Sequence, residues 1–346
     1  MTTFEPPLPR DNEPTPLPGE SALDIALRPK ALAEFVGQPL VVDNLRIAMT
    51  AARLRGEPVD HVLLSGLPGL GKTTLAELVA REMGAGFRAT SAPALERPAD
   101  LAGILTGLSA GDVLFVDEIH RLPSTVEEYL YGAMEDFVID IVLDQGARAR
   151  TVRLDVKPFT LVGATTREGL LAPPFRARFG LIERLEPYAI EDLARIAIRS
   201  CGLLKIDVDA AAAAAVASRS RGTPRVVNRF LRRLRDLAQV EGRTRIDREL
   251  VDRGLTRLGV DDRGLLAVDR LILSTLARAG GEPVGVKTLA ITLGEDERTV
   301  EDVYEPHLIR EGFILKTPRG RILTPDGEKA AGVPARPDDR LPFGAG

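Results

Sequence analysis

Short apolar runs alternate with amphipathic, helix-like segments between Val36 and Tyr188. The runs that predict strands are His61–Ser65, Phe87–Ser91, Val113–Val116 and Thr160–Ala164. Strands that alternate with helices are typical of a parallel α/β sheet. The pattern therefore predicts an α/β domain with a parallel sheet over residues 21–188. A proline-rich, acidic segment over residues 1–20 precedes it, and we expect this tail to be disordered.

A β-hairpin interrupts this alternation between the third and fourth strands. It is predicted over residues 138–156, with a glycine-containing turn at Asp144–Arg150. Ile139, Ile141 and Leu143 fall on one face of the hairpin, and the valines of the same strand fall on the other. A single hairpin cannot bury two apolar faces against its own domain, so we expect one face to be exposed for a partner. An ordinary edge hairpin is the alternative.

Two further domains are predicted after the sheet. Glu191–Gly259 is helical in pattern and contains a run of alanines, which favours helix. Three apolar-periodic segments and a short hairpin come next, an order typical of a winged helix. These segments are Leu265–Ala279, Gly285–Leu293, Arg298–Glu311 and Gly312–Leu323. We expect a small helical domain over 189–260, a winged helix over 261–332 and a disordered tail over 333–346.

Gly66-Leu-Pro-Gly-Leu-Gly-Lys-Thr73 is the strongest chemical signal of the chain. It fits the G-x-x-x-x-G-K-[ST] phosphate-binding pattern and lies between a predicted strand and a predicted helix. Glycines let backbone N–H groups point at a phosphate, and the helix N-terminus adds positive charge. Lys72 is then placed to reach the β- and γ-phosphates, and Thr73 to hold Mg²⁺. A glycine-rich turn with a chance lysine is the alternative.

Two adjacent carboxylates end the third apolar run, in Gly111-Asp-Val-Leu-Phe-Val-Asp-Glu-Ile-His120. Asp117 is placed to hold Mg²⁺ through water, and Glu118 to orient and polarise an attacking water. Either carboxylate alone could be a helix cap or a surface charge. Both together, downstream of a phosphate-binding loop, predict hydrolysis of ATP as well as binding.

Composition narrows the possible functions. The formal net charge is −4, so the whole chain is no basic coat for nucleic acid, and any DNA contact must come from a local patch. The single cysteine, Cys201, excludes an intrachain disulfide and favours a reducing compartment. There is no apolar run long enough to span a bilayer and no secretory signal. We therefore expect a cytoplasmic protein that does not enter membranes.

A local basic patch is predicted at the tip of the winged helix. Lys316, Arg319 and Arg321 surround a Pro-Arg-Gly turn, where phosphates of DNA would be met. A solvated hairpin tip is the alternative.

Several motifs in order give the chain a family resemblance. They are Leu27-Arg-Pro-Lys, Glu34-Phe-Val-Gly-Gln38, Phe115-Val-Asp-Glu-Ile-His-Arg-Leu122, Met134-Glu-Asp-Phe137, Gly163-Ala-Thr-Thr-Arg167, Arg176-Ala-Arg-Phe-Gly180, Arg221-Gly-Thr-Pro-Arg225 and Lys316-Thr-Pro-Arg-Gly-Arg321. Over roughly residues 21–330 the chain resembles the RuvB family of AAA+ ATPases. The resemblance implies a P-loop AAA+ domain, a small helical lid and a C-terminal winged helix.

The resemblance also implies roles for residues. Thr165 would sense the γ-phosphate, with Thr166 as the alternative. Arg178 would be an arginine finger offered to the neighbouring subunit, with Arg176 as the alternative, and Arg225 would be the second sensor. The implied nucleotide-binding set is Leu27, Arg28, Gly69, Leu70, Gly71, Lys72, Thr73, Thr74, Glu135, Asp136, Phe137, Arg178, Tyr188 and Arg225.

The function that the resemblance implies is ATP-driven branch migration of Holliday junctions in recombination and repair. The motor would act as a hexameric ring with ATP and Mg²⁺. RuvA would dock on the hairpin 138–156, and RuvC would join in a resolving complex. An ATP switch of the clamp-loader or initiator kind is the main rival, and a transcription regulator with a sensing ATPase is a weaker one.

Overall fold

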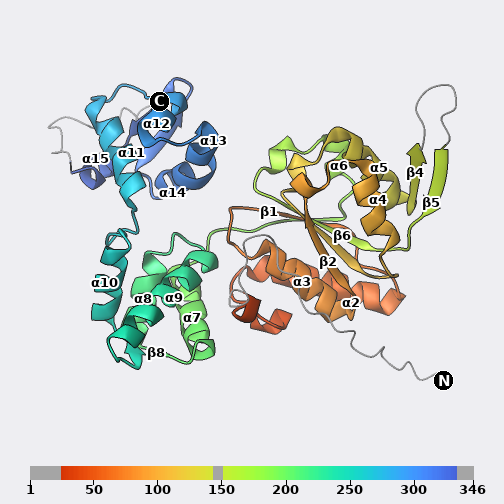
Figure 1. Ribbon diagram of the computed structural model, residues 1–346, viewed down its shortest axis with the longest axis horizontal. Coiled ribbons are helices and arrows are strands. Elements are labelled where there is room, and N and C mark those ends of the chain that lie inside the picture. The colour runs from red at the N-terminus through yellow and green to blue at the C-terminus, as the bar shows by residue number, and fades with distance from the viewer. Residues whose placement is uncertain (1–24, 143–150, 333–346) are drawn as a thin grey trace, which may run out of the picture.

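The computed structural model describes residues 25–142 and 151–332 (Figure 1). The two predicted tails, Leu143 and the hairpin turn 144–150 lie outside the described residues. No helix of the two described ranges combines the length and the apolar character needed to cross a membrane.

A five-stranded parallel sheet forms the centre of the first part of the chain, in the order β2-β3-β6-β1-β7. The strands are β1 (Val62–Ser65), β2 (Phe87–Ser91), β3 (Val113–Asp117), β6 (Thr160–Thr165) and β7 (Leu181–Arg184). The predicted parallel sheet is therefore confirmed, and β7 is an additional edge strand beside β1. The apolar run in β7 is only two residues long, Leu181 and Ile182, and two charged residues follow, so a search for apolar runs does not find it. Ser65 pairs with Thr165 in register, so the carboxyl ends of β1 and β6 meet at one edge.

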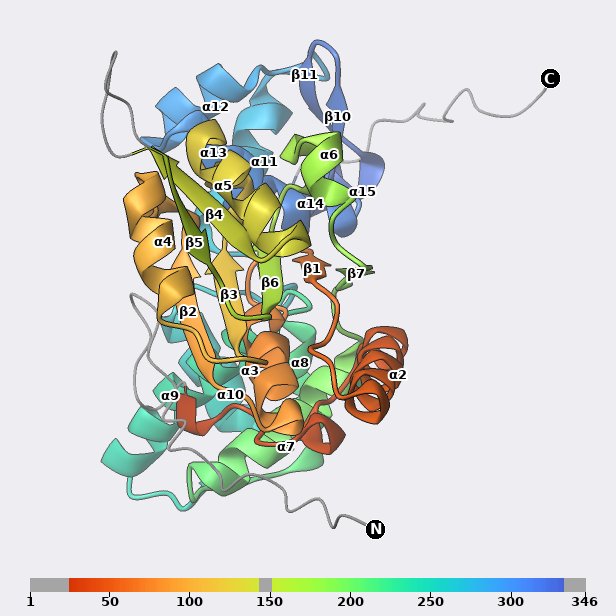
Figure 2. The same cartoon turned by 90° about the vertical axis from the view of Figure 1, so that its right-hand side faces the viewer.

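Helices cover both faces of this sheet (Figures 1 and 2). One face carries α2 (Pro39–Arg55) and α3 (Lys72–Met83), and Leu45 and Leu75 of these helices are fully buried. The other face carries α4 (Pro98–Thr106), α5 (Ser124–Glu135) and α6 (Pro173–Arg176), which enclose a second apolar core. Short 3₁₀ turns lie at Leu32–Glu34, Ala92–Ala94, Ile119–Arg121 and Glu168–Leu170.

The hairpin forms as predicted, from β4 (Val138–Val142) and β5 (Thr151–Asp155). Its apolar face does not stand free, however. Ile139 is only 1% exposed and belongs to the core beneath α4 and α5, so of the two faces the one with Ile139 is covered near the base of the hairpin. Towards the tip the same face opens, because Val152, opposite Ile141, is 37% exposed. The other face carries an exposed charged pair, with Asp140 opposite Arg153.

A helical unit follows the sheet. It consists of α7 (Ile190–Leu203), α8 (Ala210–Ser218), α9 (Pro224–Val240) and α10 (Arg248–Arg257), with a two-residue parallel ladder of β8 (Asp207–Val208) and β9 (Arg245–Ile246). Buried residues of this unit, such as Val216 and Phe230, share one apolar cluster with Leu45 and Leu75 under the sheet. The helical unit therefore shares an apolar core with the side of the sheet that carries α2 and α3.

The last unit has its own core around Leu273 and Leu308. Its elements are α11 (Ala267–Arg278), α12 (Val286–Leu293), α13 (Glu297–Thr299), a π-helical turn (Val300–Tyr304), α14 (Glu305–Arg310), β10 (Ile314–Thr317), β11 (Gly320–Leu323) and α15 (Pro325–Ala330). This is the predicted winged helix. The π-helical turn has a local cause in Pro306, which lacks an N–H and cannot close a regular helical turn.

Candidate nucleotide-binding site

The phosphate-binding loop joins β1 to α3 at the carboxyl edge of the sheet. Gly66, Gly69 and Gly71 have φ angles of 137°, 82° and 100°, which residues with a side chain rarely adopt. A Cβ on Gly69 would also lie 2.9 Å from the Cβ of Arg225. Glycine is therefore required for the shape of the loop and for the approach of α9 to it.

Lys72 begins α3 and turns back into this loop. Its ammonium donates to the carbonyl oxygens of Gly66 and Leu67, at 2.8 Å and 3.0 Å. The side chain is 7% exposed, and burial lowers the pKa of its amine, while Asp117 and Glu118 oppose that shift. The carboxylates thus keep a positive charge favourable inside the loop, where a polyphosphate would be cradled.

The two predicted carboxylates stand side by side at the end of β3. Asp117 accepts a hydrogen bond from the backbone N–H of Glu118, at 3.0 Å. Burial, with the charge of Glu118 second, raises the pKa of Asp117, and Lys72 and Arg225 pull it back. Glu118 adopts a left-handed backbone with φ of 50°, uncommon for a residue with a side chain.

The structure separates the two threonines that follow β6. Thr165 is fully buried; its hydroxyl lies 2.9 Å from His120 Nδ1 and accepts from the backbone N–H of Arg167 at 3.0 Å. Thr166 donates to Glu118 Oε2 at 3.1 Å and lines an open pocket with it. Burial lowers the pKa of His120, so its neutral ring links Thr165 to the carboxylate group. Thr166, and not Thr165, faces the space in front of Glu118.

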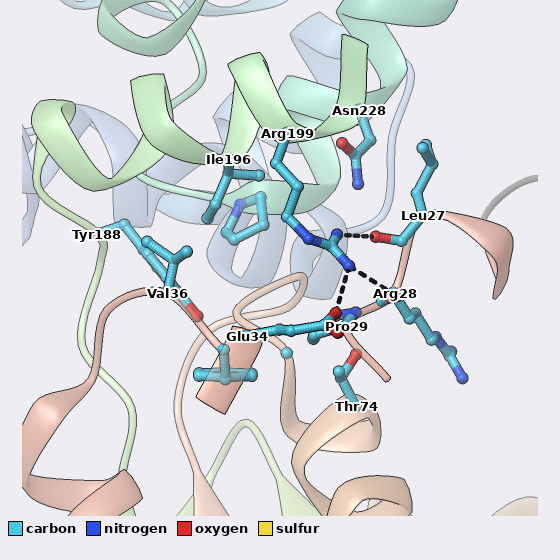
Figure 3. A pocket seen from close by; sticks show the side chains of 13 residues that line it. Leu27, Arg28, Pro29, Glu34, Val36, Thr74, Tyr188, Ile196, Arg199 and Asn228 are labelled. Atoms are coloured by element: carbon cyan, nitrogen blue, oxygen red, sulfur yellow. Dashed lines mark hydrogen bonds and ion pairs between the residues drawn. The ribbon is translucent and has the colours of Figure 1, made fainter. Parts of the chain in front are cut away.

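A second pocket lies between the sheet domain and the helical unit, as Figure 3 shows. Leu27, Arg28, Gly71 and Thr74 line it from the sheet domain, and Tyr188 from the connection to α7. Tyr188 donates its hydroxyl to the carbonyl of Leu70 at 3.1 Å, and burial raises the pKa of its phenol. Five predicted residues therefore meet around one hollow next to the phosphate-binding loop.

Arg225 of α9 lies against the phosphate-binding loop. Its backbone N–H lies 3.4 Å from the carbonyl of Gly69, at the first turn of α9, and its charge acts on the carboxyl of Asp117. The structure thus brings Arg225 next to the glycine-rich loop, and its role as the second sensor stays a prediction.

Arg178 belongs to a different cluster. Its Nη1 donates to the carbonyl of Pro174 at 2.7 Å, its Nε lies 3.1 Å from Glu135 Oε1, and its guanidinium carbon is 4.2 Å from the centre of the Tyr131 ring. Glu135 and Asp136 are exposed at the end of α5, and Phe137 follows in a left-handed conformation. In the described residues this cluster lines neither of the two pockets beside the phosphate-binding loop. Arg176, the alternative finger, pairs with Glu168 at 2.6 Å.

The basic patch at the wing is smaller than expected. Arg321 is 5% exposed, and its Nη2 donates to Glu305 at 3.0 Å and to Glu301 at 2.9 Å. Lys316 is exposed, with its ammonium 2.8 Å from Glu301. Arg319 lies at the turn, exposed and without an ion-pair partner in the part of the chain that the structure describes. The expectation that all three cations project together is wrong for Arg321, because its guanidinium neutralises two carboxylates inside the domain.

Sequence reasoning missed one link between domains. Arg167, next to Thr166, donates from its Nε to Asp302 Oδ1 of the winged helix at 3.0 Å. Both residues line a pocket of about 680 Å³, together with Glu118 and Arg298. Arg167 and Asp302 are 135 residues apart, so no pattern within either segment predicts this contact.

A phosphate-binding loop after β1, paired carboxylates at the end of β3 and a helical lid define a P-loop ATPase of the AAA+ class. Family models match in three consecutive parts. The RuvB P-loop domain, described as that of a Holliday junction DNA helicase, matches residues 27–185; the RuvB AAA lid domain matches 188–261; and the RuvB C-terminal winged helix domain matches 262–331. The chain belongs to the RuvB family.

Individual relatives support the same family assignment. A Holliday junction branch migration complex subunit RuvB of Myxococcus xanthus is 57% identical over 309 residues, 89% of this chain and 90% of the relative. A protein of the same name from Methanoregula boonei is 55% identical over 90% of this chain and 93% of its own length. The solved structure of the Thermotoga maritima RuvB Holliday junction branch migration motor superposes with a TM-score of 0.82 at 46% identity, covering 90% of this chain and 100% of that one.

Proposed function

We propose that this chain is an ATP-driven motor that moves the branch point of Holliday junctions during recombination and repair. The observation that carries the proposal is the contact of a winged helix, through Asp302 and Arg167, with the pocket that Glu118 lines. A motor needs such an attachment, because hydrolysis at the loop must change how the DNA-binding domain is held. We place this work in the cytoplasm, in agreement with the single cysteine.

In this proposal, Lys72 binds the β- and γ-phosphates, and Thr73 and Asp117 hold Mg²⁺, directly and through water. The donor set fits the ion, since a hydroxyl and a carboxylate are the hard oxygen ligands that Mg²⁺ prefers. The raised pKa of Asp117 agrees as well, because a buried carboxyl gains from a nearby cation. The ion neutralises charge on the phosphates when bound.

Glu118 polarises the attacking water. We assign the γ-phosphate sensor to Thr166 instead of Thr165, because Thr166 shares a hydrogen bond with Glu118 and faces the open pocket. Arg225 serves as the second sensor above Gly69, and the base lies between Leu27, Arg28 and Tyr188.

Arg178 is proposed to act on the ATP of a neighbouring subunit. Its position beside Glu135 and Tyr131, apart from the pockets of its own phosphate-binding loop, supports a role between subunits. Such a finger contributes roughly 10³- to 10⁵-fold in rate in other NTPases. This requires a ring, and we propose a homohexamer in which Glu135, Asp136 and Phe137 contribute to the shared interface.

Partner and domain assignments complete the proposal. RuvA docks on the outer part of the hairpin 138–156, where Val152 is exposed, and RuvC joins in the resolving complex. We propose domain limits at 21–188, 189–260 and 261–332. DNA phosphates meet the wing at Lys316 and Arg319.

The test is strand displacement from a synthetic four-way junction, with RuvA and ATP. The wild-type chain should separate the arms, and a Lys72→Ala protein, which lacks the phosphate-binding ammonium, should not. Steady ATP turnover that DNA stimulates, without any displacement of strands, would favour an ATP switch over a motor.

A further inference from the structure

A lid side chain reaches across the base pocket to its opposite wall (Figure 3). Arg199, on α7, donates from Nη1 to the carbonyl of Leu27 at 2.8 Å and from Nη2 to the carbonyl of Arg28 at 3.3 Å. The same Nη2 lies 2.9 Å from Glu34 Oε2. These three acceptors are 165 to 172 residues away in sequence.

The wall that Arg199 holds is also tied to the sheet domain. The side chain of Arg28 donates to Glu77 of α3 at 3.0 Å, and the backbone N–H of Leu32 donates to Glu82 at 3.1 Å. The segment from Leu27 to Glu34 therefore has one set of bonds to α3, which follows the phosphate-binding loop, and another to α7 of the lid.

We propose that Arg199 is a positioning residue that fixes the Leu27–Arg28 wall against the lid and thereby sets the affinity for the nucleotide base. The proposal rests on the nucleotide site proposed above. A planar guanidinium offers donors in two directions at once, so it can hold two carbonyls and a carboxylate together, which a lysine ammonium on a flexible stem does poorly. Because Arg199 contacts the base side of the pocket only, phosphate binding does not depend on it.

The test measures equilibrium binding to the full-length protein without DNA, using a non-hydrolysable ATP analogue, ADP and inorganic triphosphate. Arg199→Ala should weaken binding of the analogue and of ADP by about 10-fold each. This is the lower end of the range expected when hydrogen bonds from a charged donor are lost. Inorganic triphosphate should bind as it does to wild type. At saturating ATP, kcat should stay within about twofold, so the loss appears in KM.

Matched variants separate positioning from general damage. Arg195→Ala removes an exposed arginine one turn earlier on the same helix, which forms an ion pair with Asp192, and should leave all three affinities unchanged. Arg199→Lys should recover less than half of the lost binding free energy, and Glu34→Gln, which leaves both carbonyl contacts in place, should cost about twofold or less. Thermal unfolding without nucleotide should match wild type for Arg195→Ala and Glu34→Gln.

Two results would overturn the proposal. If Arg199→Ala binds ADP as wild type does while Lys72→Ala loses binding, the nucleotide site stands and Arg199 has no part in it. If the change weakens binding of inorganic triphosphate as much as binding of ADP, Arg199 supports the whole lid and not the base wall. If the wild-type protein binds the nucleotides but does not displace strands, that result counts against the motor function and not against the role of Arg199.

Discussion

Arg321→Ala should destabilise the winged helix rather than weaken its contact with DNA. The change leaves Glu305, 2% exposed, without the guanidinium that now binds both of its oxygens. Removing one partner of a buried ion pair costs roughly 3–5 kcal/mol, because the other charge stays buried and uncompensated. For a domain of this size each kcal/mol lowers the melting temperature by about 4–8 °C. We therefore expect the unfolding transition of this domain to fall by more than about 10 °C.

Calorimetry of the full-length protein measures this shift, and two variants serve as controls. Arg319→Ala removes an exposed cation at the same turn and should change stability by less than about 0.5 kcal/mol. A double change, Arg321→Met with Glu305→Leu, should recover most of the stability, because no unpaired charge is left inside and Glu301 keeps Lys316 as its partner.

Salt titration of DNA binding completes the test, on two unrelated duplexes and below the melting transition of every variant. Arg319→Ala should reduce the slope of log affinity against log salt by roughly 0.9, equally for both duplexes. The double variant should keep the wild-type slope. If Arg321→Ala keeps its melting temperature but loses slope, the guanidinium meets DNA after all and the argument from burial is refuted.

Four other results are expected. Glu118→Gln should bind ATP normally but lower kcat by about 10²-fold or more, and normal turnover would end its assignment as the base. Arg178→Ala should bind ATP and hydrolyse it poorly, and mixing it with Lys72→Ala protein should restore part of the turnover; mixed rings without rescue would contradict a finger in trans. Thr166→Val should lower kcat with little change in ATP affinity, and the assignment fails if turnover is unchanged. Burial, helped by two nearby arginines, lowers the pKa of His307 to about 3. The stability that the neutral ring contributes is therefore fully present above about pH 6.5, and it is lost as the pH falls, by up to about 1.4 kcal/mol per pH unit. The urea midpoint of His307→Gln should therefore drop less than that of wild type between pH 7 and 5.

The hairpin offers a separate check on partner docking. Val152→Ser should leave ATP turnover without partner intact and reduce its stimulation by RuvA, because Val152 is exposed at the outer part of the hairpin. Ile139→Ser should instead destabilise the sheet domain, since Ile139 lies in its core. Equal loss of basal turnover in both variants would show that the whole hairpin is core structure.

The sequence by itself determined the chemistry that depends on local spacing. The loop from Gly66 to Thr73 needs glycines at fixed positions between a strand and a helix, and the three positive φ angles follow that pattern. Asp117 and Glu118 are placed by the end of a buried strand. Parallel pairing brings such strand ends to one edge, so their meeting with Lys72 could be predicted without coordinates.

Only the tertiary structure decided what each polar or apolar side chain meets. Arg321 looks like any cation of a turn until Glu301 and Glu305, 20 and 16 residues earlier, are folded against it. Ile139 is buried because α4 and α5 cover its face, and Arg199 finds the carbonyl of Leu27 across 172 residues. Spacing within a segment fixes backbone shape, but burial and charge pairing depend on contacts between distant segments. These contacts make Arg321 structural, place Thr166 next to Glu118 and join Arg199 of the lid to the segment around Leu27.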